Sequence, residues 1–274
     1  MSRAWRSRLS RLGFGVSGAH GTPLLSRAKT LDLIEQAHSL GITAFDTAPA
    51  YGAGEAERRL GAALKRIGRD QVLVSTKAGL TSYGLAGRRR DFSPDGIEAG
   101  VRASLKRLDI DGADLVFLHG PDPRELTPQL FTVLDDLKRA GAFAALGVAG
   151  RGAELDAALE TGRFEALMAP GHPFLDSTER HRLEAAAEAG VAVFAIETAG
   201  DQPAPLRAPR SPADLYKLAR AARPQPSGRG RVSAVEGLRR ACGWTAVACA
   251  MMTTTRSDHL RDGAALSGVA SERY

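Results

Sequence analysis

The sequence contains few cysteines, and their placement excludes two classes of protein. Only Cys242 and Cys249 occur among 274 residues, which is too few for a disulfide framework. Neither is paired with histidine in the manner of a zinc site, so no metal centre is predicted. We expect inert or buried thiols in a reducing compartment, the cytoplasm.

Long apolar runs are absent as well. No stretch reaches the roughly 18 to 20 apolar residues that a helix needs to cross a bilayer, so no membrane partner is predicted. Residues 1–11 include four arginines, but no apolar segment follows them as it would in a secretory signal. We expect a frayed basic arm over 1–11, with an organelle transit peptide as the alternative.

Charge of one sign is in only slight excess outside this arm. The formal net charge is +6, and the arm supplies four of these charges, so the rest of the chain carries about +2. This mild charge argues against nucleic acid as a partner, although anionic phosphates would still be attracted. With 43% hydrophobic residues the chain can bury a large core, and we expect one domain over 1–274.

Short apolar runs alternate with helix-like segments along the chain. Strands are predicted at Leu12–Val16, Ile42–Asp46, Val72–Thr76, Asp114–Leu118, Ala144–Val148, Ala166–Ala169, Val191–Ile196 and Val247–Met251. Helices are predicted at Ser26–Leu40, Glu55–Ile67, Pro94–Arg107, Leu126–Ala140, Gly152–Glu160, Thr178–Ala189 and Val232–Cys242. Eight alternations predict an α/β protein with a single-domain (β/α)8 TIM barrel, and a doubly wound sheet is the alternative.

Two segments need a separate interpretation. Residues 201–231 are rich in proline and arginine, which predicts a loop insertion, either a solvated basic segment or a lid whose arginines face a phosphate. The glycine-rich turn at 17–21 follows the first strand but lacks the G-x-G-x-x-G helix start of a dinucleotide fingerprint. A Rossmann domain is therefore disfavoured.

Four polar side chains accompany the ends of three successive strands. Asp46 ends one strand and Tyr51 follows it after a proline-broken turn, while Lys77 and His119 follow the next two strands. Each alone has a structural explanation, such as a solvent-exposed lysine or a satisfied core histidine. Because the carboxyl ends of barrel strands meet at one mouth, the four together predict an active site.

These side chains are suited to donating a proton. A free tyrosine titrates near about pH 10 and is a poor acid at neutral pH. An adjacent ammonium lowers that pKa, and a carboxylate holds the ammonium in place. We expect Asp46 to hold Lys77, Lys77 to tune Tyr51, and His119 to position the substrate oxygen by a hydrogen bond.

The segments that carry these residues resemble the aldo-keto reductase superfamily. Phe45–Gly52, Ser75–Gly79 and Asp114–His119 match the family's tetrad of Asp, Tyr, Lys and His in order and spacing. The resemblance implies hydride transfer from NADPH, with NADH as the alternative, to the carbonyl carbon of a small-molecule aldehyde or ketone. It also implies that Tyr51 protonates the developing alkoxide.

The resemblance continues, with departures, on the cofactor side. Residues 251–262 are similar to the family's adenosine-phosphate segment, although an ordinary capped helix is the alternative. The implied cofactor contacts are Gly15, Thr253, Thr254, Thr255, Arg256 and His259. Where the family has polar side chains and an aromatic ring against the nicotinamide, this chain has Ala149, Gly150, Met168 and Ile196, the last followed by Glu197.

Two other functions remain open from the sequence. The same acid and base groups can run lyase, dehydratase or isomerase chemistry without a cofactor. A non-catalytic barrel that binds a small molecule is the third interpretation. The sequence indicates neither the substrate nor the oligomeric state.

Overall fold

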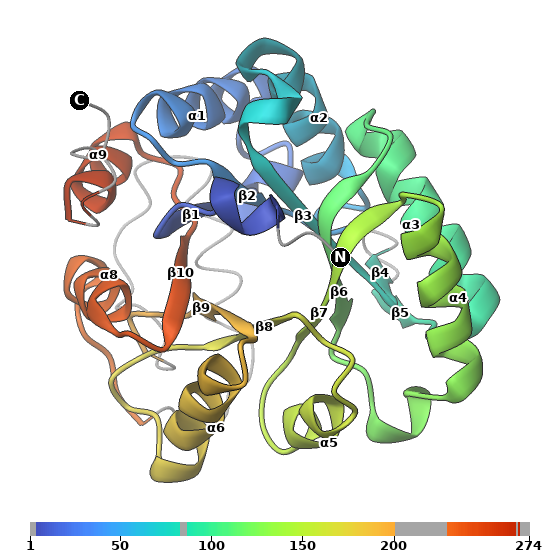
Figure 1. Ribbon diagram of the computed structural model, residues 1–274. Coiled ribbons are helices and arrows are strands. Elements are labelled where there is room, and N and C mark those ends of the chain that lie inside the picture. The colour runs from blue at the N-terminus through green and yellow to red at the C-terminus, as the bar shows by residue number, and fades with distance from the viewer. Residues whose placement is uncertain (1–3, 83–86, 201–228, 267, 269–274) are drawn as a thin grey trace.

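Eight parallel strands close into a barrel in the order β1-β10-β9-β8-β7-β6-β3-β2, with helices outside it (Figure 1). The computed structural model describes residues 4–82, 87–200, 229–266 and 268. The barrel strands are β1 (Leu12–Gly15), β2 (Ala44–Asp46), β3 (Leu73–Ala78), β6 (Ala113–His119), β7 (Phe143–Ala149), β8 (Ala166–Pro170), β9 (Ala192–Ile196) and β10 (Val247–Met252). The predicted (β/α)8 barrel is confirmed.

The helices follow the expected alternation. They are α1 (Arg27–Ser39), α2 (Glu55–Ile67), α3 (Pro94–Leu108), α4 (Pro128–Arg139), α5 (Glu154–Glu160), α6 (Ser177–Glu188), α8 (Ala234–Gly243) and α9 (Ser257–Leu266). Ser26 starts α1 as predicted, because its side chain accepts a hydrogen bond from the Lys29 backbone N–H. Gly190 follows α6 with φ of 80°, a left-handed conformation that glycine adopts without strain.

Alternation along the strands separates an inner layer from an outer one. Alternate residues such as Leu115 and Phe117, or Ala192 and Phe194, belong to one buried cluster, while Val116 and Val193 belong to the larger cluster. Since successive side chains of a strand point to opposite faces, the smaller cluster fills the barrel and the larger one packs under the helices.

The N-terminal arm is ordered from Ala4 onward, so the expectation of fraying is wrong for those residues. Trp5 is 2% exposed and joins the cluster inside the barrel. Arg6 donates hydrogen bonds to the carbonyls of Glu165 and Gly190, which lie just before β8 and β9. The arm therefore closes the amino-terminal end of the barrel, where it crosses the middle of the view in Figure 1.

Two further differences from the sequence-based expectation concern loops. A hairpin of β4 (Leu80–Ser82) and β5 (Arg88–Arg90) follows β3, although three consecutive arginines gave no strand signal. Most of the predicted insertion at 201–231 lies outside the described residues. Within the described ranges, none of the helices combines the length and apolar character required to span a membrane.

Candidate functional site

Strand register carries three of the predicted residues to one end of the barrel. Asp46 and His119 are the last residues of β2 and β6, and Lys77 is the penultimate residue of β3. The sequence had suggested that Lys77 follows its strand, but the structure places it within the strand. Ala44, Leu73 and Phe117 of these strands belong to the cluster inside the barrel, and the three polar residues lie two or four positions after them. Because side chains alternate between the two faces of a strand, all three point toward the barrel axis at its carboxyl end.

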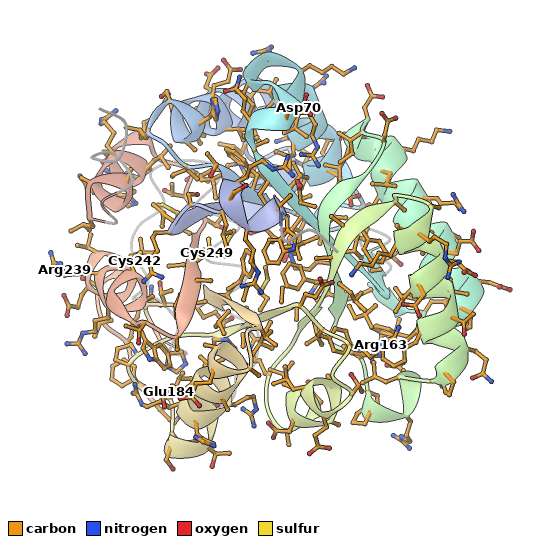
Figure 2. The ribbon with its side chains drawn as sticks, viewed as in Figure 1. Asp70, Arg163, Glu184, Arg239, Cys242 and Cys249 are labelled. Atoms are coloured by element: carbon orange, nitrogen blue, oxygen red, sulfur yellow. The ribbon has the colours of Figure 1, made fainter. Side chains whose placement is uncertain are left out.

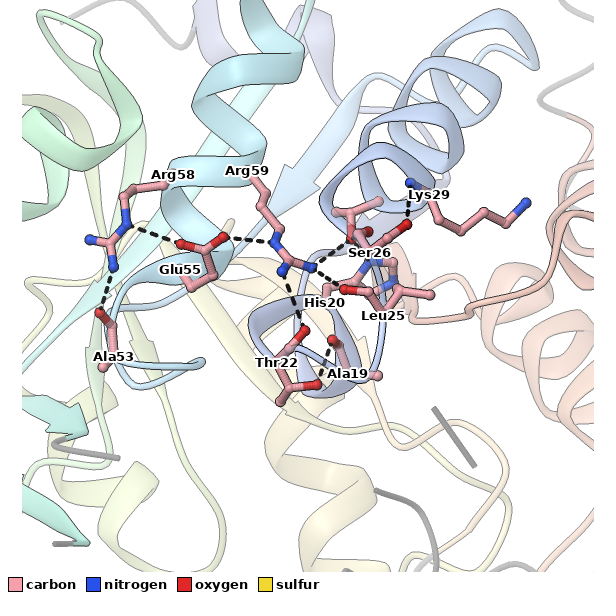
Figure 3. A network of polar contacts seen from close by, with 11 residues as sticks. Ala19, His20, Thr22, Leu25, Ser26, Lys29, Ala53, Glu55, Arg58 and Arg59 are labelled. Carbon is pink, nitrogen blue, oxygen red and sulfur yellow. Dashed lines mark hydrogen bonds and ion pairs between the residues drawn. The ribbon is translucent and has the colours of Figure 1, made fainter. Parts of the chain in front are cut away.

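Tyr51 reaches the same mouth from the loop between β2 and α2. Gly52 follows it with φ of 65°, and a Cβ there would lie 1.8 Å from the carbonyl oxygen of Gly21. A side chain cannot fit at that contact, which fixes the tyrosine loop against the 18–21 turn. Arg59 of α2 holds the segment that follows this turn, because it donates hydrogen bonds to the carbonyls of Thr22 and Leu25 (Figure 3).

The Lys77 ammonium is almost completely enclosed, with 2% of the residue exposed. Its Nζ lies 2.5 Å from Asp46 Oδ2 and 3.0 Å from the Thr47 carbonyl oxygen. The other carboxylate oxygen of Asp46 accepts a hydrogen bond from Ser75 Oγ at 2.7 Å. The buried charge pair therefore has several polar partners, as a buried pair needs to offset its desolvation.

Opposing influences set the charge of this lysine. Burial acts to lower the pKa of Lys77, but the Asp46 carboxylate and the Tyr51 phenol outweigh it and raise the pKa above its ordinary value. The lysine is therefore a permanent cation at neutral pH. A cation that cannot give up its proton acts on a neighbouring phenol through its field and its hydrogen bonds.

Tyr51 lies between the lysine and the histidine. Lys77 Nζ is 5.3 Å from the centroid of the tyrosine ring, and the rings of Tyr51 and His119 meet edge to face with centroids 6.4 Å apart. Both rings are half-buried. The structure thus brings all four predicted residues together, in an arrangement that can donate a proton to an oxygen atom beside the phenol.

The segment after β10 is joined to the first strand and turn. Thr253 Oγ1 donates a hydrogen bond to the Gly15 carbonyl, and it lies 3.2 Å from Ser17 Oγ. His20, which sequence reasoning did not select, bonds through Nε2 to the Thr254 carbonyl at 3.0 Å. Because a carbonyl only accepts, Nε2 carries the proton. This buried histidine therefore fixes the backbone of the segment.

Cationic groups gather where this segment enters α9. Arg256 forms a two-pronged ion pair with Asp258, and Lys29 Nζ lies 3.3 Å from Ser257 Oγ. Thr254 Oγ1 accepts from the Arg256 backbone N–H at 3.2 Å. Sequence reasoning missed Lys29 because it belongs to α1, far away along the chain. His259 is exposed in the first turn of α9.

These groups fit the phosphate end of a dinucleotide. Two cations, hydroxyl groups including that of Thr255, and the amino end of a ten-residue helix offer donors to an anionic group. The carboxyl ends of β7 to β9 offer fewer polar groups, since Ala149 and Met168 are buried and Ile196 is apolar. The polar side chains that follow these strands include Arg151 and Glu197, which form an ion pair, and the buried His172 and Thr198.

Neither cysteine belongs to this site. Cys249 lies on β10, buried inside the barrel wall, and Cys242 lies on α8 outside it (Figure 2). Burial raises the pKa of both thiols, so neither is an activated nucleophile.

Sequence comparison finds related proteins over much of the chain. The Aldo/keto reductase family model matches residues 11–202. The NADH-specific methylglyoxal reductase of Escherichia coli (strain K12) is 38% identical over 157 residues, covering 52% of this chain and 48% of that protein. The D-threo-aldose 1-dehydrogenase of a Pseudomonas species is 32% identical over 192 residues, covering 58% of each. The chain thus spans about half of the length of these relatives.

Solved structures share the fold over nearly the whole chain. A Pseudomonas aeruginosa protein described as an aldo-keto reductase has a TM-score of 0.74 at 25% identity, covering 96% of this chain and 91% of its own. The holo form of an aldo-keto reductase from Bacillus halodurans has a TM-score of 0.74 at 24% identity, covering 97% and 88%. The second likeness concerns the fold alone.

Proposed function

The chain belongs to the aldo/keto reductase family, and from this we propose that it reduces the carbonyl group of a small aldehyde or ketone with hydride from a nicotinamide dinucleotide. The observation that carries the proposal is the buried Asp46–Lys77 pair beside the Tyr51 ring. A permanent cation next to a phenol stabilises the tyrosinate that forms when the proton leaves. The relatives named for methylglyoxal and an aldose support a small carbonyl substrate.

Each side chain has one task in this proposal. When bound, the dinucleotide supplies a hydride to the carbonyl carbon. Tyr51 gives its proton to the carbonyl oxygen, His119 holds that oxygen by a hydrogen bond, and Lys77 stabilises the tyrosinate. Asp46 keeps the ammonium charged and in place, and the tyrosinate regains a proton from solvent after the alcohol leaves.

We favour NADPH over NADH as the dinucleotide. The support is a pair of cations at the start of α9, Arg256 just before the helix and Lys29, which reaches it from α1. Two positive charges suit the dianionic 2′-phosphate that only NADPH carries. A relative named as NADH-specific keeps NADH as the alternative.

Two measurements on the full chain test the function. The first is a titration with NADPH and NADH, followed by nucleotide fluorescence or calorimetry, for which we expect binding below millimolar concentration. The second is carbonyl reduction by Tyr51→Phe, for which we expect turnover to fall about 10²–10⁴-fold while nucleotide affinity stays within about twofold.

The negative results have distinct meanings. A folded protein that binds neither nucleotide would remove the redox step and favour the cofactor-independent lyase or isomerase interpretation. A Tyr51→Phe variant with unchanged turnover would remove the phenol as the acid while leaving the reductase activity in place.

A further inference from the structure

A carboxylate that the proposed reaction does not use is buried next to the candidate site. Glu57 lies in the first turn of α2 and is completely enclosed, with 0% of the residue exposed. Its Oε1 atom accepts a hydrogen bond from Thr76 Oγ1 at 2.7 Å, and its Oε2 atom accepts one from Arg107 Nε at 2.5 Å. The glutamate therefore joins α2 to β3 and to α3, its neighbours in Figure 1.

The first of these bonds fixes the strand that carries the lysine. Thr76 is 0% exposed and directly precedes Lys77 in β3. It shares its face of the strand with Val74 and Ala78, which belong to the cluster under the helices, whereas the ammonium points into the barrel. The hydrogen bond to Glu57 thus ties β3 to α2 at the position of the lysine.

The second bond fixes the loop that carries the tyrosine. Gly54 lies three residues after Tyr51, directly before α2, and its φ is 82°. A Cβ at Gly54 would lie 2.4 Å from Arg107 Cδ and 2.6 Å from its Nε, so the arginine packs against the backbone of this loop. Since Glu57 holds the guanidinium, it also holds the loop against α3.

Packing alone does not explain a charge at this place in α2. Ala56 and Leu60 of the same helix fill the space beneath it with apolar atoms. An apolar side chain instead of Glu57 would avoid the cost of taking a carboxylate out of water. A carboxylate adds direction, because each oxygen accepts its hydrogen bond over a narrow range of distance and angle. Glu57 therefore specifies how β3 and the tyrosine loop lie relative to each other.

That relative position determines how strongly the ammonium acts on the phenol. Lys77 belongs to β3 and Tyr51 to the loop, and the lysine Nζ lies 5.3 Å from the centroid of the tyrosine ring. The attraction between an ammonium and a tyrosinate falls as their separation grows, and it falls further where water enters between them. A shift of the loop relative to the strand would weaken the field that favours loss of the phenol proton.

We propose that Glu57 is a positioning residue for the proton transfer, an inference that rests on the proposed reductase function. Through Thr76 it holds the strand of Lys77, and through Arg107 it holds the loop of Tyr51. The carboxylate acts through these two contacts and gives up no proton itself. Its effect is to keep the phenol and the ammonium at the separation at which the ammonium stabilises the tyrosinate.

The test substitutes Thr76 in two ways that separate its hydroxyl group from its volume. Thr76→Val keeps the size of the side chain but cannot donate to Glu57, whereas Thr76→Ser keeps the donor and loses a buried methyl group. Ionisation of the Tyr51 phenol is followed by ultraviolet absorbance, with the same variant carrying Tyr51→Phe subtracted. We expect the midpoint of this titration to rise by about one pH unit in Thr76→Val and to stay within about 0.2 unit of wild type in Thr76→Ser.

Turnover gives the second measurement, with methylglyoxal as the carbonyl compound and saturating NADPH. The kcat of Thr76→Val should fall about tenfold with KM within about twofold, because a less stabilised tyrosinate makes the phenol a weaker acid. Glu57→Gln should change in the same direction, since its NH₂ group cannot accept from a second donor. Glu98→Gln removes an exposed carboxylate that pairs with Arg102 on α3, and it should behave as wild type does.

Thermal unfolding separates positioning from folding. Thr76→Ser loses some stability with its methyl group, so a purely structural role predicts that its titration and turnover change as well. Equal changes in Thr76→Ser and Thr76→Val would overturn the inference, as would a Thr76→Val variant that titrates and turns over as wild type does. A wild type that binds neither nucleotide and reduces no methylglyoxal, but shows the expected order of phenol titrations, would overturn the proposed function and not the placement of Tyr51 by Glu57.

Discussion

At the scale of single residues, the site depends on a charge that is expensive to bury. Taking an ammonium and a carboxylate out of water costs several kcal/mol for each ion before any partner is added. Lys77 and Asp46 offset this through direct contact and through hydrogen bonds to the Thr47 carbonyl and the Ser75 hydroxyl. Apolar residues in place of such a buried pair often leave the free energy of unfolding unchanged or raise it, so stability does not explain the pair, and a catalytic role does.

His20 gives a residue-scale prediction about pH. Burial lowers the pKa of its imidazole from 6.5 to about 4, and the nearby positive charge of Arg59 also lowers it, while the hydrogen bond to the Thr254 carbonyl opposes them. Between these values the unfolded chain binds a proton that the folded protein does not. The free energy of unfolding should therefore fall as pH drops from about 6.5 to 4, by up to about 3 kcal/mol from this residue.

The measurement is urea unfolding of wild type and His20→Gln at several pH values from 4.5 to 7.5. Glutamine can still donate to the Thr254 carbonyl but does not titrate, so the variant should lose less stability toward acid. The difference between the two curves isolates His20 from the carboxylates that also titrate. Parallel curves would show that the histidine is not buried in its neutral form.

At the scale of elements, our proposal that the start of α9 binds the 2′-phosphate of NADPH gives a prediction about nucleotide preference. Arg256→Ala removes a cation that the structure places at the helix entry, held by Asp258. We expect its dissociation constant for NADPH to rise about tenfold or more, and that for NADH to change by less than about twofold. Calorimetric titration of both nucleotides measures this, with Arg261→Ala in the same helix as a control. Equal effects on both nucleotides would contradict a contact with the 2′-phosphate.

The N-terminal segment Ala4–Arg8 gives a second element-scale prediction. Trp5 fills the amino-terminal end of the barrel with 2% of its surface exposed, and Arg6 lies over its ring at 4.8 Å. Trp5→Ala should lower the free energy of unfolding by about 3–5 kcal/mol, because it removes a large buried side chain and leaves a cavity. Urea unfolding measures the loss, and Ser7→Ala, which removes only one exposed hydrogen bond, should change little. A loss below about 1 kcal/mol would mean that the segment does not close the barrel.

Such elements also show what the sequence could and could not predict. Helix α2 begins and ends at the predicted residues because glycines precede and follow an amphipathic segment. The tetrad was found because strand ends converge in a barrel, a rule that needs only the order of elements. Thr254 lies 234 residues from its partner His20, and Arg151 lies 46 residues from its partner Glu197, and contacts at such separations leave no local pattern in the chain. The burial of Trp5 was missed because the basic arm around it has no apolar periodicity. This one tryptophan nevertheless anchors the arm inside the end of the barrel.

At the scale of the whole molecule, the first and last strands of the barrel are paired. Leu12, Gly13 and Phe14 of β1 pair with residues 250–252 of β10, so the sheet closes through both ends of the chain. Opening such a barrel between any two strands leaves two unpaired strand edges, which closure otherwise removes. That the chain forms one domain remains a prediction, and closure is the physical reason to expect cooperative unfolding.

Ligand-linked stability tests this expectation together with nucleotide binding. A ligand that binds only the folded protein at 100 times its dissociation constant adds about 2.7 kcal/mol to the free energy of unfolding. For a chain of this size we expect the thermal midpoint to rise by about 5–10 °C with NADPH, as one transition seen by both calorimetry and tryptophan fluorescence. The tryptophan signal comes from Trp5 and from Trp244, which precedes β10, so both report the amino-terminal end of the barrel. Because the nucleotide is proposed to bind at the carboxyl end, a single shifted transition would link both ends of the barrel. Two transitions, of which only one moves with nucleotide, would show that the chain divides into separate units.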